Sequence, residues 1–204
     1  MSKDIISHFK KADPKFHKVL LKVHALHGDK LFELKKHDFL FDRLIESIIS
    51  QQLSVRVADV IYDRVLNLIP DKKFTPESIL KLNDEILRKA GMSYRKIKYI
   101  KDLSSKVESK ELDLDNLENL ENEEVIEQLT KVKGIGKWTA EMFLMSALGR
   151  PDIFSHGDLG LKNAIKKIYN LEKYDEVEVE KIVIKWSPFR THAARILWKS
   201  LELK

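Results

Sequence analysis

Apolar residues recur at intervals of three and four along most of the chain, which is the spacing of an amphipathic helix. The longest such pattern covers residues 38–68, where Leu, Ile and Val fill the apolar positions and Pro70 closes it. Residues 159–169, 177–185 and 191–203 show the same spacing, and strand-like alternation is scarce. We therefore predict a nearly all-helical protein whose central helix lies within residues 38–68.

Capping residues divide the middle of the chain into further helices. Asn83 precedes an acidic start and a helical run to residue 90, and Gly91 stands where a left-handed C-terminal cap is favoured. Another helix is expected to begin near Ser93. Asn122 is predicted to cap a helix that stops at a glycine turn, after which residues 137–148 resume the helical pattern.

Composition narrows the class of protein further. The 204 residues suffice for one domain or two small lobes, and we treat residues 1–204 as a single domain. Lys and Arg outnumber Asp and Glu by 37 to 32, a mild excess that suits a polyanionic partner or simple solubility. The chain has no cysteine, no signal-peptide pattern and no apolar run of the ~20 residues that a membrane span needs. We expect an intracellular protein without a membrane partner.

The glycine turn lies in the segment VKGIGKWTA, residues 132–140. Its two glycines allow positive φ and close backbone approach. Free amides at the start of the helix near Lys137, together with the helix dipole, can bind a phosphate, and Lys131 and Lys133 would strengthen that contact. The alternative is a tight corner of purely structural value.

Residues 129–145 (LTKVKGIGKWTAEMFLM) resemble the helix-hairpin-helix motif of the HhH-GPD DNA glycosylase superfamily, and within it most closely the 3-methyladenine DNA glycosylase II family. Residues 47–60, 91–104 and 186–200 match that family in the expected order, whereas the first ~35 residues carry no comparable signal. The resemblance implies a compact, two-lobed all-α fold without an N-terminal β-rich domain, acting as a monomer, with the motif (about 122–148) at a cleft. It implies phosphate contacts from Lys133, Gly134, Gly136, Lys137 and Thr139.

Asp158 lies 22 residues beyond Gly136, where the loop 149–158 gives way to a helix. By position alone it is a helix cap stabilised as an anion by the dipole. The resemblance makes it the catalytic carboxylate, and Asp152 fits that role less well. Cleavage of an N-glycosidic bond builds positive charge on the sugar, which a fixed carboxylate stabilises.

The resemblance places three side chains around the flipped base: Trp138, Trp198 and Met142. An electron-rich ring attracts a cationic base by about 0.5–2 kcal/mol when the contact is desolvated. Tryptophan at helical spacing is also typical of a core, and that alternative stays open. Met142 and Lys199 stand where a well-known form of the family has tyrosines, which leaves base preference open.

Two absences bear on the mechanism. Relatives that also nick the strand carry a Schiff-base lysine at the position of Trp138, and Lys137 points roughly 100° away from it on a helix. We therefore expect no lyase step. Without cysteine there is no cysteine-ligated iron–sulfur cluster, and we expect no cofactor.

The segment Gln51–Ser54 matches the family's loop that fills the gap left in the DNA. Gln52 is the first choice for the inserted side chain and Leu53 the second, although Leu53 also fits the core pattern of residues 38–68. Arg95, Lys96 and Lys98 are candidates for phosphate contacts or for a solvated helix face. An alkali ion, Na⁺ or K⁺, held by the carbonyls of Thr130, Val132 and Ile135 is implied only by the resemblance.

These features favour a monofunctional glycosylase that removes alkylated purines from damaged double-stranded DNA after flipping the nucleotide out. Two alternatives remain. One is a non-catalytic DNA-binding module that uses the hairpin alone, and the other is a sister glycosylase for oxidised or deaminated bases.

Overall fold

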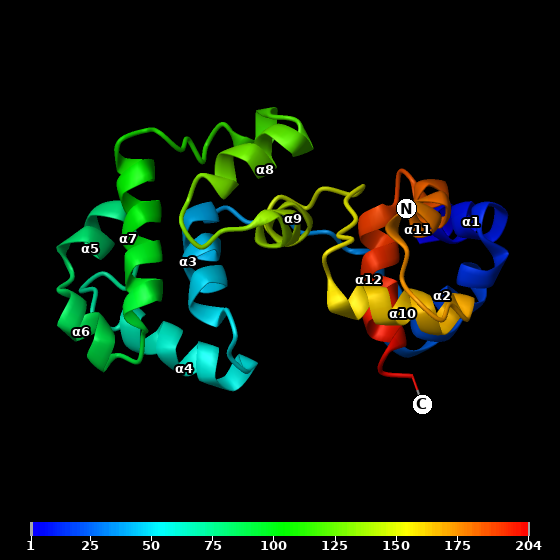
Figure 1. Ribbon diagram of the computed structural model, residues 1–204, viewed down its shortest axis with the longest axis horizontal. Coiled ribbons are helices and arrows are strands. Elements are labelled where there is room, and N and C mark those ends of the chain that lie inside the picture. Colours follow the sequence, from blue (N-terminus) through cyan, green and yellow to red (C-terminus); the bar gives the residue numbers. More distant parts are fainter. Residues whose placement is uncertain (1, 204) are drawn as a thin grey trace. The chain divides into compact units, whose positions relative to one another are not determined.

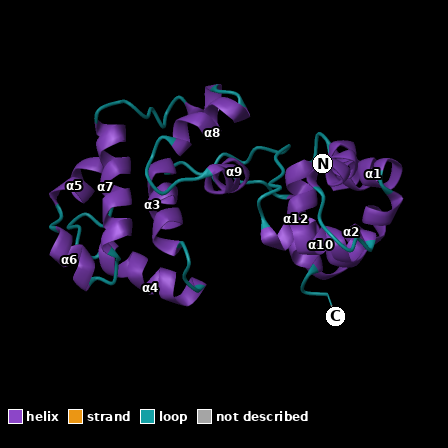
Figure 2. Cartoon of the chain, viewed as in Figure 1, coloured by secondary structure: helices purple, strands orange, loops and turns teal. Residues whose placement is uncertain are grey.

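The computed structural model describes residues 2–203, and among these residues every regular element is a helix (Figures 1 and 2). The all-α fold predicted from the apolar spacing is confirmed. In chain order the helices are α1 (Ser2–Ala12), α2 (Pro14–His27), α3 (Leu40–Ser50), α4 (Val55–Leu66), α5 (Pro76–Lys81), α6 (Asp84–Lys89), α7 (Tyr94–Glu108), α8 (Asn122–Thr130), α9 (Lys137–Ser146), α10 (Leu159–Tyr169), α11 (Glu176–Val183) and α12 (Arg190–Ser200). Short 3-10 helices cover Gly28–Phe32, Leu117–Asn119 and Ile184–Trp186.

Backbone contacts divide the chain into two compact units. The hairpin unit is His37–Phe143, and the terminal unit combines residues 2–36 with residues 144–203. Within the described residues no helix is both long and apolar enough to cross a lipid bilayer.

The terminal unit is built around aromatic side chains. Helix α2 packs against α10 and α12, and α1 packs against α2 (Figure 1). Phe9, Phe16 and Trp186 are fully buried, with ring centroids 4.9 Å apart for Phe9 and Phe16 and 4.8 Å apart for Phe16 and Trp186. The N-terminal residues, which carry no family signal in the sequence, therefore supply a large part of this core.

Asp13 joins the N-terminal helices to the rest of the terminal unit. Its carboxylate caps α2 by accepting the Phe16 N–H at 2.9 Å, and it also accepts the Trp186 indole N–H at 3.0 Å and the Tyr169 hydroxyl. The residue is buried, so these bonds satisfy polar atoms that are largely shielded from water. Aspartate at the N-cap followed by proline at the first helical position is a common start of a helix, and Asp13 and Pro14 form this pair at the start of α2.

Helix α7 is the centre of the hairpin unit, where α3, α5 and α6 pack against it. The predicted caps are confirmed: Asn83 accepts the Glu85 N–H at 2.8 Å, Gly91 has φ 110°, and Ser93 accepts the Lys96 N–H at 3.3 Å.

The single central helix expected within residues 38–68 is wrong. The structure has α3 and α4 instead, separated by a turn at Gln51–Ser54. Gln52 takes φ 57°, which a right-handed helix does not allow, and the Lys96 ammonium binds the carbonyls of Ile49 and Gln51 at 2.7 Å each. In a continuous helix those carbonyls would accept the N–H groups four residues ahead. The apolar period continues across the break, so it gives no sign of it.

Two element boundaries also differ from expectation. Asn122 is the first residue of α8 rather than its N-cap. The N-cap is Glu121, whose backbone N–H donates to the Glu124 carboxylate at 2.8 Å. Helix α9 ends at Ser146, two residues before the predicted end.

Candidate active site and DNA-binding hairpin

Asp158 occupies the N-cap of α10, as the sequence predicts. Its Oδ1 atom accepts the Leu161 backbone N–H at 2.8 Å and the indole N–H of Trp198, from α12, at 2.9 Å. The residue is 9% exposed. A carboxylate at a helix N-terminus that accepts two N–H donors is held in one orientation.

Gly160 makes room for this pair. A Cβ atom at residue 160 would lie 3.1 Å from Asp158 Oδ1 and 3.1 Å from Trp198 Cδ1. Both distances are tighter than ordinary contacts, so a side chain here would push the carboxylate and the indole apart. The Asp158–Trp198 contact and the glycine two residues on thus form one local arrangement within the terminal unit.

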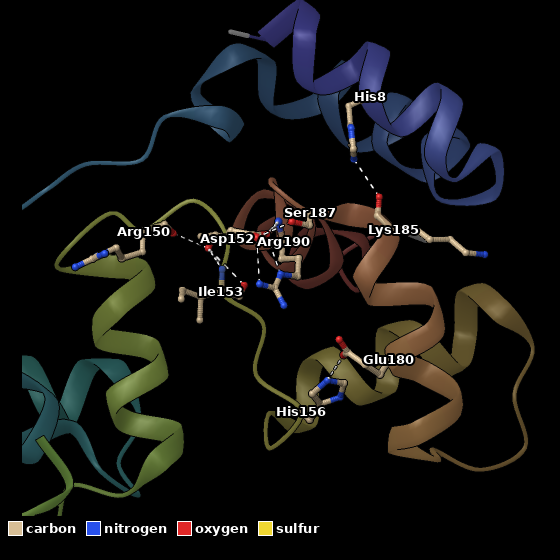
Figure 3. A network of polar contacts seen from close by, with 10 residues as sticks. His8, Arg150, Asp152, Ile153, His156, Glu180, Lys185, Ser187 and Arg190 are labelled. Carbon is tan, nitrogen blue, oxygen red and sulfur yellow. Dashed lines mark hydrogen bonds and ion pairs between the residues drawn. The ribbon is translucent and has the colours of Figure 1, made fainter. Parts of the chain in front are cut away.

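The loop 149–158 is tied to the start of α12. Arg190 grips the Asp152 carboxylate with its Nε at 2.8 Å and its Nη2 at 3.0 Å, and the Ser187 hydroxyl adds a bond of 2.7 Å (Figure 3). Burial by itself would raise the pKa of Asp152, but the bonds from Arg190 and Ser187 lower it below its ordinary value. Asp152 therefore works as a structural anion.

Thr191 and Gly149 fix the same loop. The Thr191 hydroxyl donates to the Arg150 carbonyl at 2.6 Å and accepts the Ile153 N–H at 3.0 Å. Gly149 has φ 65°, and a Cβ there would lie 3.3 Å from the Lys35 carbonyl oxygen.

His156 anchors the end of the loop, two residues before Asp158. Its ring nitrogens lie 2.6 Å from the Tyr174 hydroxyl and 2.8 Å from a Glu180 carboxylate oxygen, and Figure 3 shows His156 facing Glu180 of α11. No group of His, Asp and Glu side chains suited to a metal ion occurs within residues 2–203. The loop carrying Asp158 is thus held by polar contacts at both ends.

The glycine turn of the hairpin rests on α7. Gly134 has φ 85°, and a Cβ there would lie 2.1 Å from the Tyr99 ring, so only glycine fits. The Lys133 N–H binds the Asp102 carboxylate at 2.9 Å. At Gly136 nothing lies within 4 Å of the position a Cβ would take. No neighbouring protein atom therefore requires glycine at position 136. The open space beside this backbone is compatible with the close approach of a ligand.

The three hairpin lysines each have a carboxylate nearby. The Nζ–O distances are 3.9 Å from Lys131 to Glu127, 3.4 Å from Lys133 to Asp102 and 3.9 Å from Lys137 to Glu141. Thr139, in the first turn of α9, is buried at 6% exposed, and its predicted phosphate contact stays a prediction.

The turn at Gln51–Ser54 is bound to this hairpin. The Gln51 amide nitrogen donates to the Gly134 carbonyl at 2.8 Å, and Gln52 accepts from the Arg95 guanidinium at 3.4 Å. Leu53 lies outside both helices and is 37% exposed, so the alternative that places it in the core is wrong. The Lys96 ammonium binds the backbone of this turn. Burial, and to a smaller extent repulsion from the Arg95 charge, lowers the pKa of Lys96. Its side chain is half-buried rather than fully solvated, and the phosphate contact stays a prediction.

The three residues predicted around the base fall in different units. Trp138 and Met142 are four residues apart on α9 in the hairpin unit, so they share a helix face, and Trp138 is 47% exposed. Trp198 belongs to the terminal unit, where the structure brings it to Asp158.

Several positioning residues carry no signal in the sequence that would reveal their role. Tyr99 and Asp102, three residues apart on one face of α7, support the hairpin. Gln51 lies inside the recognised loop segment, but its bond to Gly134 spans 83 residues and no local pattern announces it.

Comparisons with known proteins agree with this arrangement. The family model described as "HhH-GPD superfamily base excision DNA repair protein" matches residues 45–189. DNA-3-methyladenine glycosylase 1 of Schizosaccharomyces pombe is 38% identical over 173 residues, which cover 80% of this chain and 73% of that protein.

Two solved structures are similar over nearly the whole chain. The S. pombe 3-methyladenine DNA glycosylase Mag1 in complex with abasic DNA superposes with a TM-score of 0.82 at 32% identity, covering 98% of this chain and 97% of that one. A DNA-3-methyladenine glycosidase from Bacillus halodurans gives a TM-score of 0.77 at 38% identity, covering 91% and 89%. The chain therefore belongs to the HhH-GPD superfamily of base excision DNA repair proteins, and within it to the family of the DNA-3-methyladenine glycosylases.

Proposed function

We propose that this protein flips alkylated purines such as 3-methyladenine and 7-methylguanine out of double-stranded DNA and hydrolyses their N-glycosidic bonds. The observation that carries the proposal is the single carboxylate of Asp158, held at the N-terminus of α10 by Leu161 and Trp198. The names of the relatives support the choice of substrate class.

Asp158 acts in this proposal through its charge. The breaking glycosidic bond leaves positive charge on the sugar, and a preorganised anion stabilises that charge without reorganising in the transition state. The same carboxylate can orient the attacking water. Purines alkylated at a ring nitrogen carry positive charge and leave without protonation, so a second carboxyl group serving as general acid is unnecessary.

The hairpin unit supplies the grip on DNA. Backbone amides at the start of α9, with Gly134 and Gly136, would hold a phosphate, and Lys133 and Lys137 would add charge. The turn at Gln51–Ser54 presents Gln52 and the exposed Leu53 to the gap in the base stack. Both side chains are exposed, and the hydrogen bond that Gln52 accepts from Arg95 favours Leu53 as the filling side chain.

The carbonyls at the end of α8 are the proposed ligands of an alkali ion. Helix α8 ends at Thr130, where backbone carbonyls lose their intrahelical partners. In the turn that follows, the Val132 carbonyl accepts the Ile135 N–H at 3.1 Å, which leaves its second lone pair for a cation. Carbonyl oxygens of Thr130, Val132 and Ile135 suit a hard cation, which would neutralise charge where a phosphate approaches.

We further propose that the enzyme is a monomer that releases the base by hydrolysis of the N-glycosidic bond without cutting the strand. Trp138 offers no amine for a Schiff base, and Lys137, one residue earlier, lies 3.9 Å from Glu141.

A panel of duplexes tests the function. Each duplex carries one base: 3-methyladenine, 7-methylguanine, 1,N6-ethenoadenine, hypoxanthine, uracil or 8-oxoguanine, and free base and strand cuts are measured separately. The proposal expects release of the methylated purines, intact strands, and no protein–DNA adduct on borohydride treatment. Release confined to uracil, hypoxanthine or 8-oxoguanine would favour a sister glycosylase, and binding without release of any base would favour a non-catalytic module.

A further inference from the structure

The positive charge of this protein is concentrated at its N-terminus. Residues 1–36 contain nine lysines and four acidic residues, a formal charge of +5 that equals the charge of the whole chain. The hairpin unit contains 17 Lys and Arg against 20 Asp and Glu, and is therefore acidic at −3. The unit that carries the proposed phosphate-binding turn thus has the wrong sign of net charge for long-range attraction of DNA.

Local pairing sharpens this contrast. Each hairpin lysine lies within 4 Å of a carboxylate, as described above for Lys131, Lys133 and Lys137. A lysine already beside a carboxylate contributes less to the field that a distant phosphate experiences. The hairpin can hold a phosphate through its amides, but its side chains are poorly suited to drawing a duplex in.

Helix α2 carries the opposite arrangement. Its apolar residues Phe16, Leu20 and Val23 are buried, whereas an exposed row of lysines follows the outer side of the helix at spacings of three and four. We define this row as the lysine face: Lys15, Lys18 and Lys22. None of the three forms an ion pair with any residue in the range 2–203, although Lys15 also lies over the Tyr169 ring at 5.3 Å.

The dimensions suit a nucleic-acid backbone. Seven residues of helix separate Lys15 from Lys22, a rise of roughly 10 Å, which corresponds to about three steps of duplex at 3.4 Å each. Lys10 and Lys11, both exposed, end α1 just before the buried Asp13 and add to the same field. Asp13 and the aromatic core hold these helices in place, so the lysines are presented on a fixed surface.

We propose that the lysine face of α2 is a second phosphate-binding surface, which contacts the backbone of duplex DNA without regard to sequence or damage. This inference rests on the proposed function, since it assigns to that enzyme the surface that recruits its substrate. The hairpin then supplies local contacts to the backbone, and α2 supplies most of the salt-dependent attraction.

The test compares two triple variants of the full chain on undamaged duplex. K15Q/K18Q/K22Q removes the lysine face while keeping helix propensity, because Lys and Gln are nearly equal helix formers. K89Q/K110Q/K173Q removes the same charge from exposed lysines elsewhere. Duplex affinity is measured against salt concentration, and circular dichroism checks that both variants fold.

We expect the slope of log K against log salt concentration to become smaller in magnitude by about three for K15Q/K18Q/K22Q. For K89Q/K110Q/K173Q the slope should stay near the wild-type value. Wild type should then lose about 60-fold more affinity than K15Q/K18Q/K22Q when salt rises from about 50 to about 200 mM. Equal slopes for the two variants would overturn it. A second result would also overturn it: K15Q/K18Q/K22Q loses binding to vesicles of phosphatidylcholine and phosphatidylserine but keeps the wild-type salt slope on duplex DNA. The titration uses undamaged DNA and does not depend on base release. If the damaged duplexes described above released no base, the proposed function would fail, but this comparison of the two variants would still be valid.

Discussion

The indole Nε1 of Trp198 donates a 2.9 Å hydrogen bond to Oδ1 of Asp158. The Leu161 backbone N–H reaches the same oxygen at 2.8 Å, so a side chain from α12 and the first turn of α10 together fix one carboxylate. The sequence suggested Trp198 as a ring that stacks on the base. In the structure its indole N–H binds the carboxylate of Asp158, and we propose that it positions this residue.

Replacing Trp198 by Phe keeps an aromatic ring and removes the N–H donor. A hydrogen bond to a charged group is worth about 1.5–3 kcal/mol, so we expect the single-turnover rate of base release to fall by about 10- to 100-fold. Stopped time courses at saturating enzyme measure that rate without a contribution from DNA binding.

Trp186→Phe is the matched control, because it removes an indole N–H that binds Asp13 at 3.0 Å instead. This variant should lower the free energy of unfolding and leave the single-turnover rate of the folded enzyme unchanged. Similar rates for Trp198→Phe and Trp186→Phe would refute the positioning role.

The two hairpin glycines should respond differently to alanine. A methyl group at residue 134 would meet the Tyr99 ring at 2.1 Å and force an unfavourable φ, so Gly134→Ala should lower the unfolding free energy by more than about 1 kcal/mol. At Gly136 the methyl group meets no protein atom, so Gly136→Ala should fold normally but bind duplex DNA more weakly. Thermal unfolding and duplex titration separate the two effects, and a Gly136→Ala protein with full affinity would argue against phosphate binding there.

Lys96→Met should loosen the turn at Gln51–Ser54. Met keeps an unbranched side chain only one atom shorter but leaves the carbonyls of Ile49 and Gln51 without the donor that binds each at 2.7 Å. We expect a loss of about 1–3 kcal/mol in unfolding free energy and faster amide hydrogen exchange at residues 51–54. Lys98→Met provides the comparison on the same helix. Unchanged exchange in the Lys96 variant would show that the turn holds its shape without the ammonium.

His192 should make stability depend on pH. The residue is 3% exposed, and burial, reinforced by the nearby Arg195 charge, lowers the pKa of its imidazole to about 4, although a hydrogen bond with the Phe32 backbone acts in the opposite direction. Because the unfolded chain binds the proton near pH 6.5, stability is lost as pH falls from about 6.5 toward about 4. We expect about 2 kcal/mol less unfolding free energy from this group at pH 5 than at pH 7. Urea titrations of wild type and His192→Gln at both values should show that difference shrink in the variant.

Much of the fold follows from local sequence. Helical spacing and the caps at Asn83, Ser93 and Asp158 predict helices that the structure confirms, because a cap depends on residues only two or three positions away. The break between α3 and α4 was missed because the apolar period continues across it, and Lys96, which binds the carbonyl of Gln51 there, lies 45 residues away in the chain. Asp13 was missed as a link in the core because its partner Trp186 is 173 residues distant.

The candidate site divides in the same way. The resemblance identified Asp158 and the glycine turn from short motifs, whereas periodicity alone left Asp158 a helix cap. The contacts that hold these groups, from Trp198, Arg190, Tyr99 and Gln51, are made between segments far apart in the chain, and no periodicity predicts them.

The most direct measurement is release of 3-methyladenine by Asp158→Asn in a single turnover. Asparagine keeps a carbonyl oxygen for the Leu161 and Trp198 N–H groups and caps helices as well as aspartate does, so the variant should fold and bind duplex DNA like wild type. Only the charge is lost. The account predicts a fall in the release rate of at least about 100-fold with duplex affinity retained. Release at the wild-type rate would contradict the role assigned to Asp158.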